Sequence, residues 1–373
     1  FAQNGLRARQ ILLDRRLPAL SRLDRLMVDM ANSYQEKHLS VYSDMRWPLK
    51  TGIGNVMAAM IARKPARMDL IGLQVKGSIG SPFSPFAISR ALRRSAADPD
   101  GVYWSAGFVP PAMMKIPCVV TVHDLTHLRF YSRFHAAYYN HYLKPLYRRC
   151  SAIVCVSDYT RREFLDWSGM SPDKVSVVYN SVDQAYFENQ ETSQFAYRYV
   201  LYPGNHRGYK NLERLISAFA ASTLPQQDIH LVMTGSVNQS LVEQAMRLGV
   251  VSKLHFLGRV NDEDLPKLYK GALLVAFVSL YEGFGLPIVE AMASGVPVLT
   301  SDVSAMPEVA GNAARIVDPY SIKAIADGLN DLTGDDVLRQ DLIGKGREQV
   351  ARFNWDRSAK TLWDIVDHAY ASA

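Results

Sequence analysis

The chain has 373 residues, of which 48% are hydrophobic and 21% are charged. This length exceeds that of a comfortable single core, so two domains are expected, and the composition excludes an intrinsically disordered chain. The longest apolar runs, such as residues 272–280, are about half as long as the ~20 residues that a membrane-spanning helix requires, so no segment is expected to cross a bilayer.

Charge is unevenly distributed along the sequence. Residues 1–186 contain 25 Lys and Arg against 14 Asp and Glu, a net charge of +11, whereas residues 187–373 contain 17 against 22, a net charge of −5. The basic half has no recognisable nucleic-acid-binding module, and its basic residues are interleaved with Leu, Phe and Tyr. This mixture favours an anionic membrane surface over nucleic acid as a partner.

The three cysteines, Cys118, Cys150 and Cys155, are odd in number and lie in or beside apolar stretches. This predicts buried free thiols and a reducing compartment, so we expect a cytosolic protein.

Residues 1–36 form a first segment with its own pattern. Apolar residues recur at steps of three or four on either side of Pro18, and six arginines stand against three aspartates. The pattern predicts an amphipathic helical extension, which either packs on its own domain or lies on a membrane surface.

From residue 38 the sequence alternates between short β-branched runs and helical patterns. The expected strands are residues 38–44, 68–73, 101–107, 117–124, 152–158 and 174–180, and then 199–204, 229–235, 253–258, 273–279, 296–301 and 314–317. A glycine-bearing loop is expected over residues 46–55 before a helix at 56–64, and further helices are expected at 211–222 and 262–272. Such alternation predicts parallel sheets that are covered on both faces.

These elements predict two similar Rossmann-like α/β domains, each a doubly wound sheet. The first covers residues 37–190 and the second residues 191–373; the polar stretch 183–198 joins them, and the last helix could cross back to the first domain. In open parallel sheets a ligand binds at the carboxyl ends of the strands, so two facing sheets predict one central cleft.

The stretch "YEGFGLPIVEAMASG", residues 281–295, places Glu282 and Glu290 on either side of a Gly-Phe-Gly turn. Pro287 suits the first position of a helix that should end at Gly295. The N–H groups at such a helix start favour a phosphate or diphosphate, and Glu290, in the first turn, would accept hydrogen bonds from a ribose diol. Glu282 would accept hydrogen bonds from hydroxyls of the group that the diphosphate carries. The alternative is that both acids only complement the positive end of the helix.

Residues 280–311 resemble the Glu-x7-Glu signature of the retaining glycosyltransferases of family 4, which have the GT-B fold. Four other segments resemble further motifs of that family in the expected order: residues 119–130, 151–164, 202–219 and 255–269. The resemblance covers roughly residues 38–360, and it implies an acceptor domain followed by a nucleotide-sugar-binding domain.

The resemblance implies roles for residues of the second domain. Glu290 matches the acid that holds the nucleotide ribose, and Glu282 matches the acid beside the donor sugar. The backbone amides of Phe284, Gly285 and Leu286 match those near the sugar and the diphosphate.

Other matching positions lie on two further segments of the second domain. Arg207 and Lys210 fall where the family places cations on the diphosphate, and Asn205 stands where many members have arginine, so Lys210 is the firmer candidate. The alternative is a pair of surface cations on a loop. Arg259 and Val260 match the stretch that borders the nucleotide base.

In the first domain His123, which ends the expected strand 117–124, matches the histidine near the donor sugar; the alternative is a histidine that caps the next turn. His127, four residues further on, is ambiguous. Gly52 and Gly54 match the loop whose backbone approaches the donor phosphate and the acceptor, although glycines also suit a plain tight turn.

No cofactor is predicted, and a metal-independent reaction is expected. Asp98-Pro99-Asp100 and Asp262-Glu263-Asp264 have the acid-x-acid form of a metal-dependent transferase, but both lie at predicted turns or helix starts, where Asp caps helices. There is no Cys/His cluster with zinc spacing and no G-x-S-x-G elbow of a hydrolase.

Residues 130–150 are aromatic and basic at helical spacing, which suits a headgroup interface or a sugar-diphosphate-lipid acceptor; core packing with solvated arginines is the alternative. Together with residues 1–36 and the basic half, this stretch favours peripheral attachment to the inner leaflet of the cytoplasmic membrane.

The resemblance implies a glycosyltransferase that moves a hexose from a nucleotide diphosphate sugar, with retention, to a lipid-linked saccharide or oligosaccharide of a bacterial surface polysaccharide. The similarity to mannosyltransferase-like members favours GDP-mannose, with UDP-glucose or another UDP-sugar as the alternative donor. A nucleotide-sugar epimerase of related fold and a non-catalytic GT-B scaffold protein are the other two alternatives.

Overall fold

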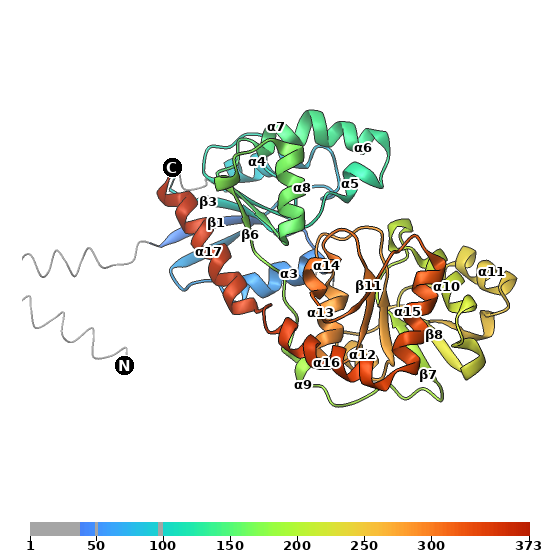
Figure 1. The fold of residues 1–373 in the computed structure, drawn as a ribbon. Coiled ribbons are helices and arrows are strands. Elements are labelled where there is room, and N and C mark those ends of the chain that lie inside the picture. The colour runs from blue at the N-terminus through green and yellow to red at the C-terminus, as the bar shows by residue number, and fades with distance from the viewer. Residues whose placement is uncertain (1–37, 49–50, 96–99) are drawn as a thin grey trace, which may run out of the picture.

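The structure is a computed structural model that describes residues 38–48, 51–95 and 100–373. The predicted amphipathic extension, residues 1–36, lies outside the described residues, as do Asp98 and Pro99 of the first acid-x-acid sequence. The described residues form two domains, each of which is a parallel six-stranded sheet with helices on both faces (Figure 1).

The sheet of the N-terminal domain has the strand order β2-β1-β3-β4-β5-β6, and all its pairs are parallel. Its strands are β1 (Leu39–Asp44), β2 (Met68–Leu73), β3 (Val102–Ser105), β4 (Cys118–Val122), β5 (Ala152–Cys155) and β6 (Val175–Val177). All five residues of β4 are buried, as expected for a central strand that helices cover on both faces.

The sheet of the C-terminal domain has the order β12-β11-β10-β7-β8-β9 and is also parallel. Its strands are β7 (Arg198–Tyr202), β8 (Ile229–Met233), β9 (Leu254–Phe256), β10 (Leu274–Phe277), β11 (Val298–Ser301) and β12 (Arg315–Val317). The strand order reverses between β7 and β10, and in the other sheet between β1 and β3. Ligands bind open α/β sheets at such switch points.

Helices fill the connections of both domains. In the first half of the chain they are α3 (Gly52–Ile61), α4 (Ser84–Arg94), α5 (Thr126–Arg129), α6 (Arg133–Tyr138), the π-helix η1 (Tyr139–Leu143), α7 (Lys144–Tyr147), α8 (Asp158–Ser168), the 3₁₀ turn η2 (Pro172–Lys174) and α9 (Gln184–Glu188). In the second half they are α10 (Leu212–Ala221), α11 (Gln239–Arg247), α12 (Leu265–Lys270), α13 (Leu286–Ala293), α14 (Met306–Ala310), α15 (Ile322–Gly334), α16 (Asp336–Val350) and α17 (Trp355–Ala371), with the 3₁₀ turns η3 (Gly208–Lys210), η4 (Pro225–Gln227) and η5 (Val251–Lys253).

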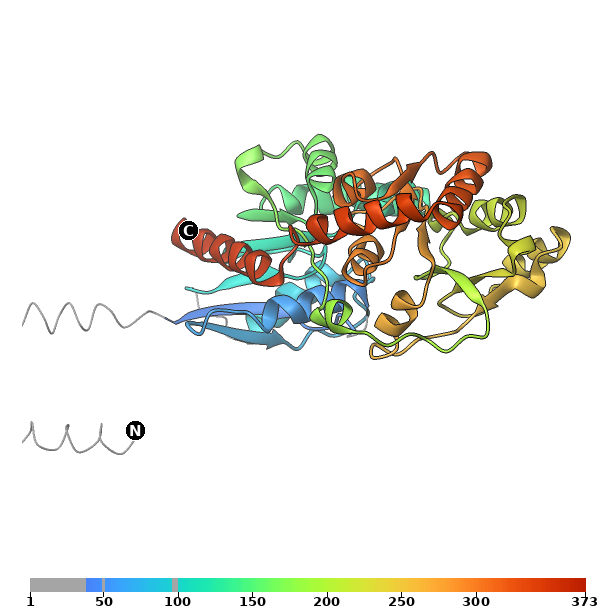
Figure 2. The same ribbon diagram turned by 60° about the horizontal axis from the view of Figure 1, so that its bottom comes forward.

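Two separate apolar clusters cover the two faces of the N-terminal sheet. Ile88 of α4, Leu143 of η1 and Phe164 of α8 share one cluster. The other cluster joins α3 to α17, the last helix of the chain, which packs on the N-terminal sheet after α16 has packed on the C-terminal domain (Figure 2). Trp363 of α17 stacks edge-on against Trp104 of β3, with 5.1 Å between ring centroids.

Two local expectations were wrong. Gly52 and Gly54 lie in the first turn of α3 and not in a loop, because the side chain of Thr51 caps that turn by accepting from the Gly54 N–H at 3.2 Å. α13 begins at Leu286, so Pro287 is its second residue and Glu290 lies beyond its first turn. The polar stretch 183–198, about which no local structure was predicted, contains the helix α9 with Tyr186 buried.

One other expectation, that of buried free thiols, is confirmed. Cys118, Cys150 and Cys155 are buried and free. None of the helices within the described ranges is both long and apolar enough to span a bilayer.

Candidate active site

The carboxyl ends of β7 and β10, the neighbouring strands at the switch point of the C-terminal sheet, bring Lys210 and Glu282 together. The Lys210 Nζ donates a hydrogen bond of 2.6 Å to Glu282 Oε1, and the two side chains are only 11% and 13% exposed. An ion pair with so little exposure needs further polar contacts to offset its loss of hydration.

The ammonium of Lys210 also lies 5.1 Å from the ring centroid of Phe277 and 5.3 Å from that of Tyr209. The backbone N–H of Glu282 donates to Ser304 Oγ at 3.0 Å, which fixes the start of the glycine turn. Because an ammonium has three N–H donors and Glu282 uses one, Lys210 retains donors for an anionic ligand.

The Gly-Phe-Gly turn leads from this ion pair into α13. Gly285 is the N-cap residue of α13 with φ of 104°, a conformation that favours glycine, and no side chain caps the helix. The side chain of Phe284 is buried against Phe353, with 5.3 Å between ring centroids, so only its backbone could serve a ligand. The uncapped N–H groups and the positive end of α13 suit an anion.

Glu290 lies on α13 at the wall of a cavity of about 280 Å³. The hydroxyl of Tyr269, which is itself buried, donates a hydrogen bond to the carboxylate of Glu290. Burial raises the pKa of Glu290 to about 7, the nearby carboxylate of Asp183 adds to this increase, and the hydrogen bond from Tyr269 opposes it.

The cavity lies between the two domains and is rich in acidic groups. Its polar wall residues include Asn55 of α3, Asp183, Tyr186 of α9, Asp262, Glu263 and Glu290. A ligand that enters this cavity therefore meets mostly hydrogen-bond acceptors.

His123 follows β4 and keeps its ring close to the backbone of β3. Its Nε2 lies 2.8 Å from the carbonyl oxygen of Ala106, and because a carbonyl only accepts, this nitrogen carries the proton. Burial lowers the pKa of His123, so Nδ1 of the neutral ring is an acceptor. Asp124, rather than His123, caps the next turn, because its Oδ1 accepts from the Thr126 N–H at 2.9 Å.

The N-terminal domain contacts the Gly-Phe-Gly turn directly. A Cβ atom on Gly283 would lie 1.7 Å from the carbonyl oxygen of His123, so the two backbones touch. The hydroxyls of Ser157 and Thr160, in the first turn of α8, donate to the Gly283 carbonyl at 2.6 and 2.9 Å.

Two further contacts join the domains beside this turn. The carboxylate of Glu308 accepts hydrogen bonds from the backbone N–H groups of Asp158 and Tyr159 at 2.7 and 2.8 Å. The hydroxyl of Tyr281 donates to Glu163 Oε2 at 2.5 Å and accepts from the Leu125 N–H at 3.0 Å. The glycine turn is thus bounded by α8 on one side and by the loop after β4 on the other.

The remaining predicted residues lie further out. Arg207 and Asn205 are exposed; the Asn205 side chain accepts from the Arg207 N–H at 3.3 Å, and the Arg207 guanidinium donates to the hydroxyl of Tyr131 in the N-terminal domain. Arg259 is exposed and Val260 packs against the core of the C-terminal domain.

The predicted N-terminal glycines and Leu286 lie around the cavity. Gly52 is exposed at the start of α3, and Asn55, one turn later, lines the cavity together with Leu286. Gly54 has no room for a side chain, since a Cβ atom would lie 2.0 Å from the carbonyl oxygen of Pro48.

One expectation about the acidic residues was wrong. Asp264 occupies the N-cap position of α12, but its side chain accepts no capping hydrogen bond, while Asp262 and Glu263 line the cavity beside Glu290. Sequence reasoning also missed Tyr269, which donates a hydrogen bond to Glu290, because a tyrosine in a short helix carries no signal of a polar partner elsewhere in the chain. Within the described ranges no three His, Cys, Asp or Glu side chains are grouped to hold a metal ion.

Two family models match the chain. The model described as "Glycosyl transferases group 1" matches residues 186–349, and the model described as "Glycosyltransferase Family 4" matches residues 69–186. Together they cover most of both domains.

Curated relatives and solved structures agree with these models. The O-antigen chain mannosyltransferase B of Escherichia coli is 30% identical in an alignment of 278 positions that covers 69% of this chain and 71% of that protein. The O-antigen chain mannosyltransferase RfbU of Salmonella typhimurium is 28% identical over 64% of this chain and 65% of its own length.

Among solved structures, Alr3699/HepE of Anabaena, determined with UDP and glucose, has a TM-score of 0.71 at 16% identity and covers 88% of this chain and 99% of its own. A glycosyltransferase from Rickettsia africae has a TM-score of 0.66 at 15% identity over 90% of this chain and 99% of its own. These structures share the fold of this chain.

Proposed function

This chain belongs to the glycosyltransferases of group 1 and family 4, with the GT-B fold, and from that premise we propose that it transfers mannose from GDP-mannose, with retention, to a lipid-linked saccharide or oligosaccharide. The acceptor would be an intermediate of a bacterial surface polysaccharide, as the names of the O-antigen mannosyltransferases suggest. The reaction would take place at the cytoplasmic face of the membrane.

The acid-lined cavity beside Glu290 is the observation that carries the choice of donor. Glu290 would accept hydrogen bonds from the ribose diol, which leaves Asp262, Glu263 and Asp183 as the acidic part of the remaining wall. Guanine offers adjacent N–H donors at N1 and N2, whereas uracil offers mainly carbonyl acceptors. A wall of carboxylates therefore favours guanine, and a UDP-sugar is the alternative donor.

The proposed mechanism assigns the charge of the leaving diphosphate to Lys210 and to the N–H groups at the start of α13, and not to a metal ion. Glu282, which accepts a hydrogen bond from Lys210, would also accept hydrogen bonds from hydroxyls of the sugar. The bond between the anomeric carbon and the diphosphate oxygen breaks as the acceptor hydroxyl bonds to that carbon on the same face. The departing phosphate oxygen takes the proton of the hydroxyl, so that GDP and the glycoside are formed.

His123 would contribute from the opposite wall of the cleft. Its neutral ring offers Nδ1 as an acceptor for a sugar hydroxyl, while Ala106 fixes the ring through Nε2. The amides of Phe284, Gly285 and Leu286 would serve the diphosphate and the sugar, and Arg207 and Arg259 would act from the rim of the site.

A thermal-shift panel with GDP-mannose, GDP, UDP-glucose and UDP tests the donor, because a ligand that binds only the native state raises its apparent stability. We expect GDP-mannose and GDP to stabilise the protein more than the uridine nucleotides do. Stabilisation by UDP-glucose alone would contradict the choice of guanine. Donor turnover without any acceptor would point instead to an epimerase.

A matched pair of variants tests the cavity itself. Asp262→Asn and Glu263→Gln should reduce the preference for GDP over UDP, whereas Glu243→Gln, which removes an acid from α11 away from the cavity, should not. If all three variants keep the preference of the unmodified protein, the carboxylates of the cavity do not select the base.

A further inference from the structure

The outer face of α4 carries an unusual combination of side chains. Phe83 and Phe86 are 71% and 51% exposed, and Arg90, Arg93 and Arg94 continue the same stripe at spacings of three or four residues. The opposite face of α4 is buried in the apolar cluster of the N-terminal domain. The phenylalanines are therefore not needed for the core of this domain.

The aromatic part of the stripe continues onto α6 and η1. Phe86 stacks on Tyr142 with 5.9 Å between ring centroids, and Tyr142 lies 5.3 Å from the ring of Tyr138. One turn before Tyr138, Phe134 is 86% exposed. The hydroxyl of Tyr138 donates to the carbonyl of Pro82 at 3.0 Å, which joins the two helices.

We call the set of Phe83, Phe86, Phe134, Tyr138, Tyr142, Arg90, Arg93 and Arg94 the α4–α6 surface. Figure 1 places α4, α6 and α7 together on the N-terminal domain, on the side of the sheet away from α17.

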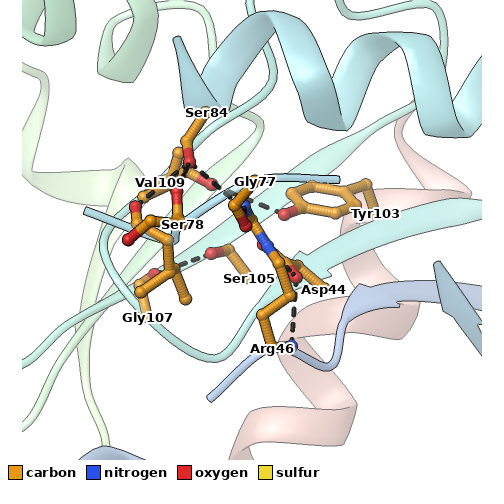
Figure 3. Close-up of polar contacts among 10 residues, drawn as sticks. Asp44, Arg46, Gly77, Ser78, Ser84, Tyr103, Ser105, Gly107 and Val109 are labelled. Atoms are coloured by element: carbon orange, nitrogen blue, oxygen red, sulfur yellow. Dashed lines mark hydrogen bonds and ion pairs between the residues drawn. The ribbon is translucent and has the colours of Figure 1, made fainter. Parts of the chain in front are cut away.

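A buried ion pair holds the start of α4 in place. The guanidinium of Arg46 binds Asp44, at the end of β1, with a shortest N–O distance of 2.6 Å. The same guanidinium donates to the carbonyl of Gly77 at 2.9 Å and to Ser84 Oγ at 3.2 Å, as Figure 3 shows. Phe83 and Phe86 are thus presented from a fixed position.

The charge around this surface is strongly positive. Residues 70–157 contain ten Lys and Arg but only three Asp and Glu. In the part of the chain that the structure describes, Arg90, Arg93 and Arg94 form no ion pair with a carboxylate. Exposed aromatic side chains next to unpaired arginines need a partner that is apolar and anionic at once.

We propose that the α4–α6 surface docks on an anionic phospholipid bilayer. The phenylalanine rings enter the boundary between headgroups and acyl chains, the tyrosines lie at the headgroup level, and the arginines bind lipid phosphates. Exposed phenylalanine rings fit the apolar boundary of a bilayer better than they fit the paired strands of a nucleic acid. The proposal rests on the proposed function in one respect: the lipid-linked acceptor would reach the enzyme from the bilayer at this surface.

This surface is continuous with the edge of the active-site cleft. Phe130, between α5 and α6, lies 5.6 Å from the rings of Tyr209 and Tyr281 in the C-terminal domain, and Tyr131 contacts Arg207. Docking through α4 and α6 therefore brings the acceptor side of the cleft close to the leaflet.

Flotation of the full chain with vesicles tests this surface. The unmodified protein should float with vesicles of phosphatidylcholine and phosphatidylglycerol at low salt, and less with phosphatidylcholine alone. Replacing Arg90, Arg93 and Arg94 by Glu should lower the partition coefficient by at least about 100-fold, since the loss of each basic residue near an anionic surface weakens binding several-fold and the new carboxylates are repelled. Replacing Phe83, Phe86 and Phe134 by Ser should lower it as well.

The matched control is the triple variant Arg247→Glu, Arg347→Glu and Arg357→Glu, which changes the net charge equally at exposed positions outside this surface. It should float like the unmodified protein. If the α4 arginine variant and the phenylalanine variant both float like the control, or if the unmodified chain binds an RNA oligomer but no anionic vesicle, the proposal is wrong. Stabilisation by GDP-mannose and turnover of a detergent-solubilised acceptor should be unchanged in all variants, so these assays report separately on the proposed function.

Discussion

The hydroxyl of Ser157, at the N-cap of α8, donates a 2.6 Å hydrogen bond to the carbonyl of Gly283, which lies 126 residues later in the other domain. Gly283 opens the turn that leads into α13, whose N-terminus has no side-chain cap. The conformation of the proposed diphosphate site therefore depends on how the two domains are packed together.

Ser157→Ala should lower kcat/KM by about fivefold, because one buried hydrogen bond is worth about 1 kcal/mol. The same change removes the cap of α8, whose Thr160 N–H donates to Ser157 Oγ at 3.0 Å. Ser321→Ala is the control, since Ser321 caps α15 at 3.1 Å without touching the other domain. Ser321→Ala should lose about 1 kcal/mol of unfolding free energy and Ser157→Ala about 2 kcal/mol, and only Ser157→Ala should lose transfer activity. Equal activities would show that the contact does not matter for the reaction.

Gly283→Ala should separate the two domains, because the new Cβ atom would collide with the His123 carbonyl oxygen at 1.7 Å. We expect a larger radius of gyration by small-angle X-ray scattering and loss of most transfer activity. Gly344→Ala, on the exposed side of α16 where nothing lies within 4 Å, should be active and slightly more stable. An active Gly283→Ala enzyme would mean that the closed arrangement is not required.

Lys210→Met and Glu282→Gln should each destabilise the protein by about 3 kcal/mol, because each leaves a buried charge without its partner. The double variant should lose less unfolding free energy than the two single variants lose together. A double-mutant cycle of denaturant unfolding would measure this difference. All three proteins should fail to transfer sugar. Additive losses would mean that the pair is not coupled in solution.

Glu290→Gln should change the dependence of stability on pH. The pKa of Glu290 is about 7 in the folded protein against an ordinary value of 4.5, so the unfolded chain loses this proton first as the pH rises. The unmodified protein therefore loses stability between pH 4.5 and 7, by up to about 3 kcal/mol, and the loss is complete above pH 7.

The glutamine variant should match the unmodified protein near pH 4 and be more stable at pH 8, when thermal unfolding is compared across this range. At pH 8 the glutamine variant should bind the donor less tightly than the unmodified protein does. At this pH the Glu290 carboxylate of the unmodified protein is ionised and accepts hydrogen bonds from the ribose hydroxyls. If the difference in stability does not vary with pH, the carboxyl of Glu290 is ionised over the whole range.

The two sheets could be predicted from sequence because buried parallel strands are short runs rich in β-branched and other apolar residues, as in β4. The start of α3 could not, because Gly52 and Gly54 favour a loop by intrinsic preference, and only Thr51 and the close approach of Pro48 explain why a helix begins there. The preference of the two glycines for a loop was overridden by the Thr51 cap and by the packing of the preceding Pro48 against Gly54.

The candidate site was predictable where its residues share one short motif, as Glu282, Gly285 and Glu290 do. The cavity wall was not, because Asp183 and Asp262 come from distant segments that meet only in the folded chain. Sequence alone gave Asp262 a capping role, since an acid near a helix start is usually a cap. The hydrogen bond from Ser157 to the Gly283 carbonyl could not be predicted either, because it forms only when the two domains pack together.

The last helix, α17, completes the first domain. Its 17 residues cover one face of the N-terminal sheet, and Trp363 donates to the carbonyl of Met60 at 3.1 Å. During synthesis α3 alone packs on that face until α17 has left the ribosome. The N-terminal domain therefore reaches its final packing only after the C-terminal domain has been synthesised, and a chain that stops before α17 would expose apolar side chains of the sheet instead of yielding an independent half.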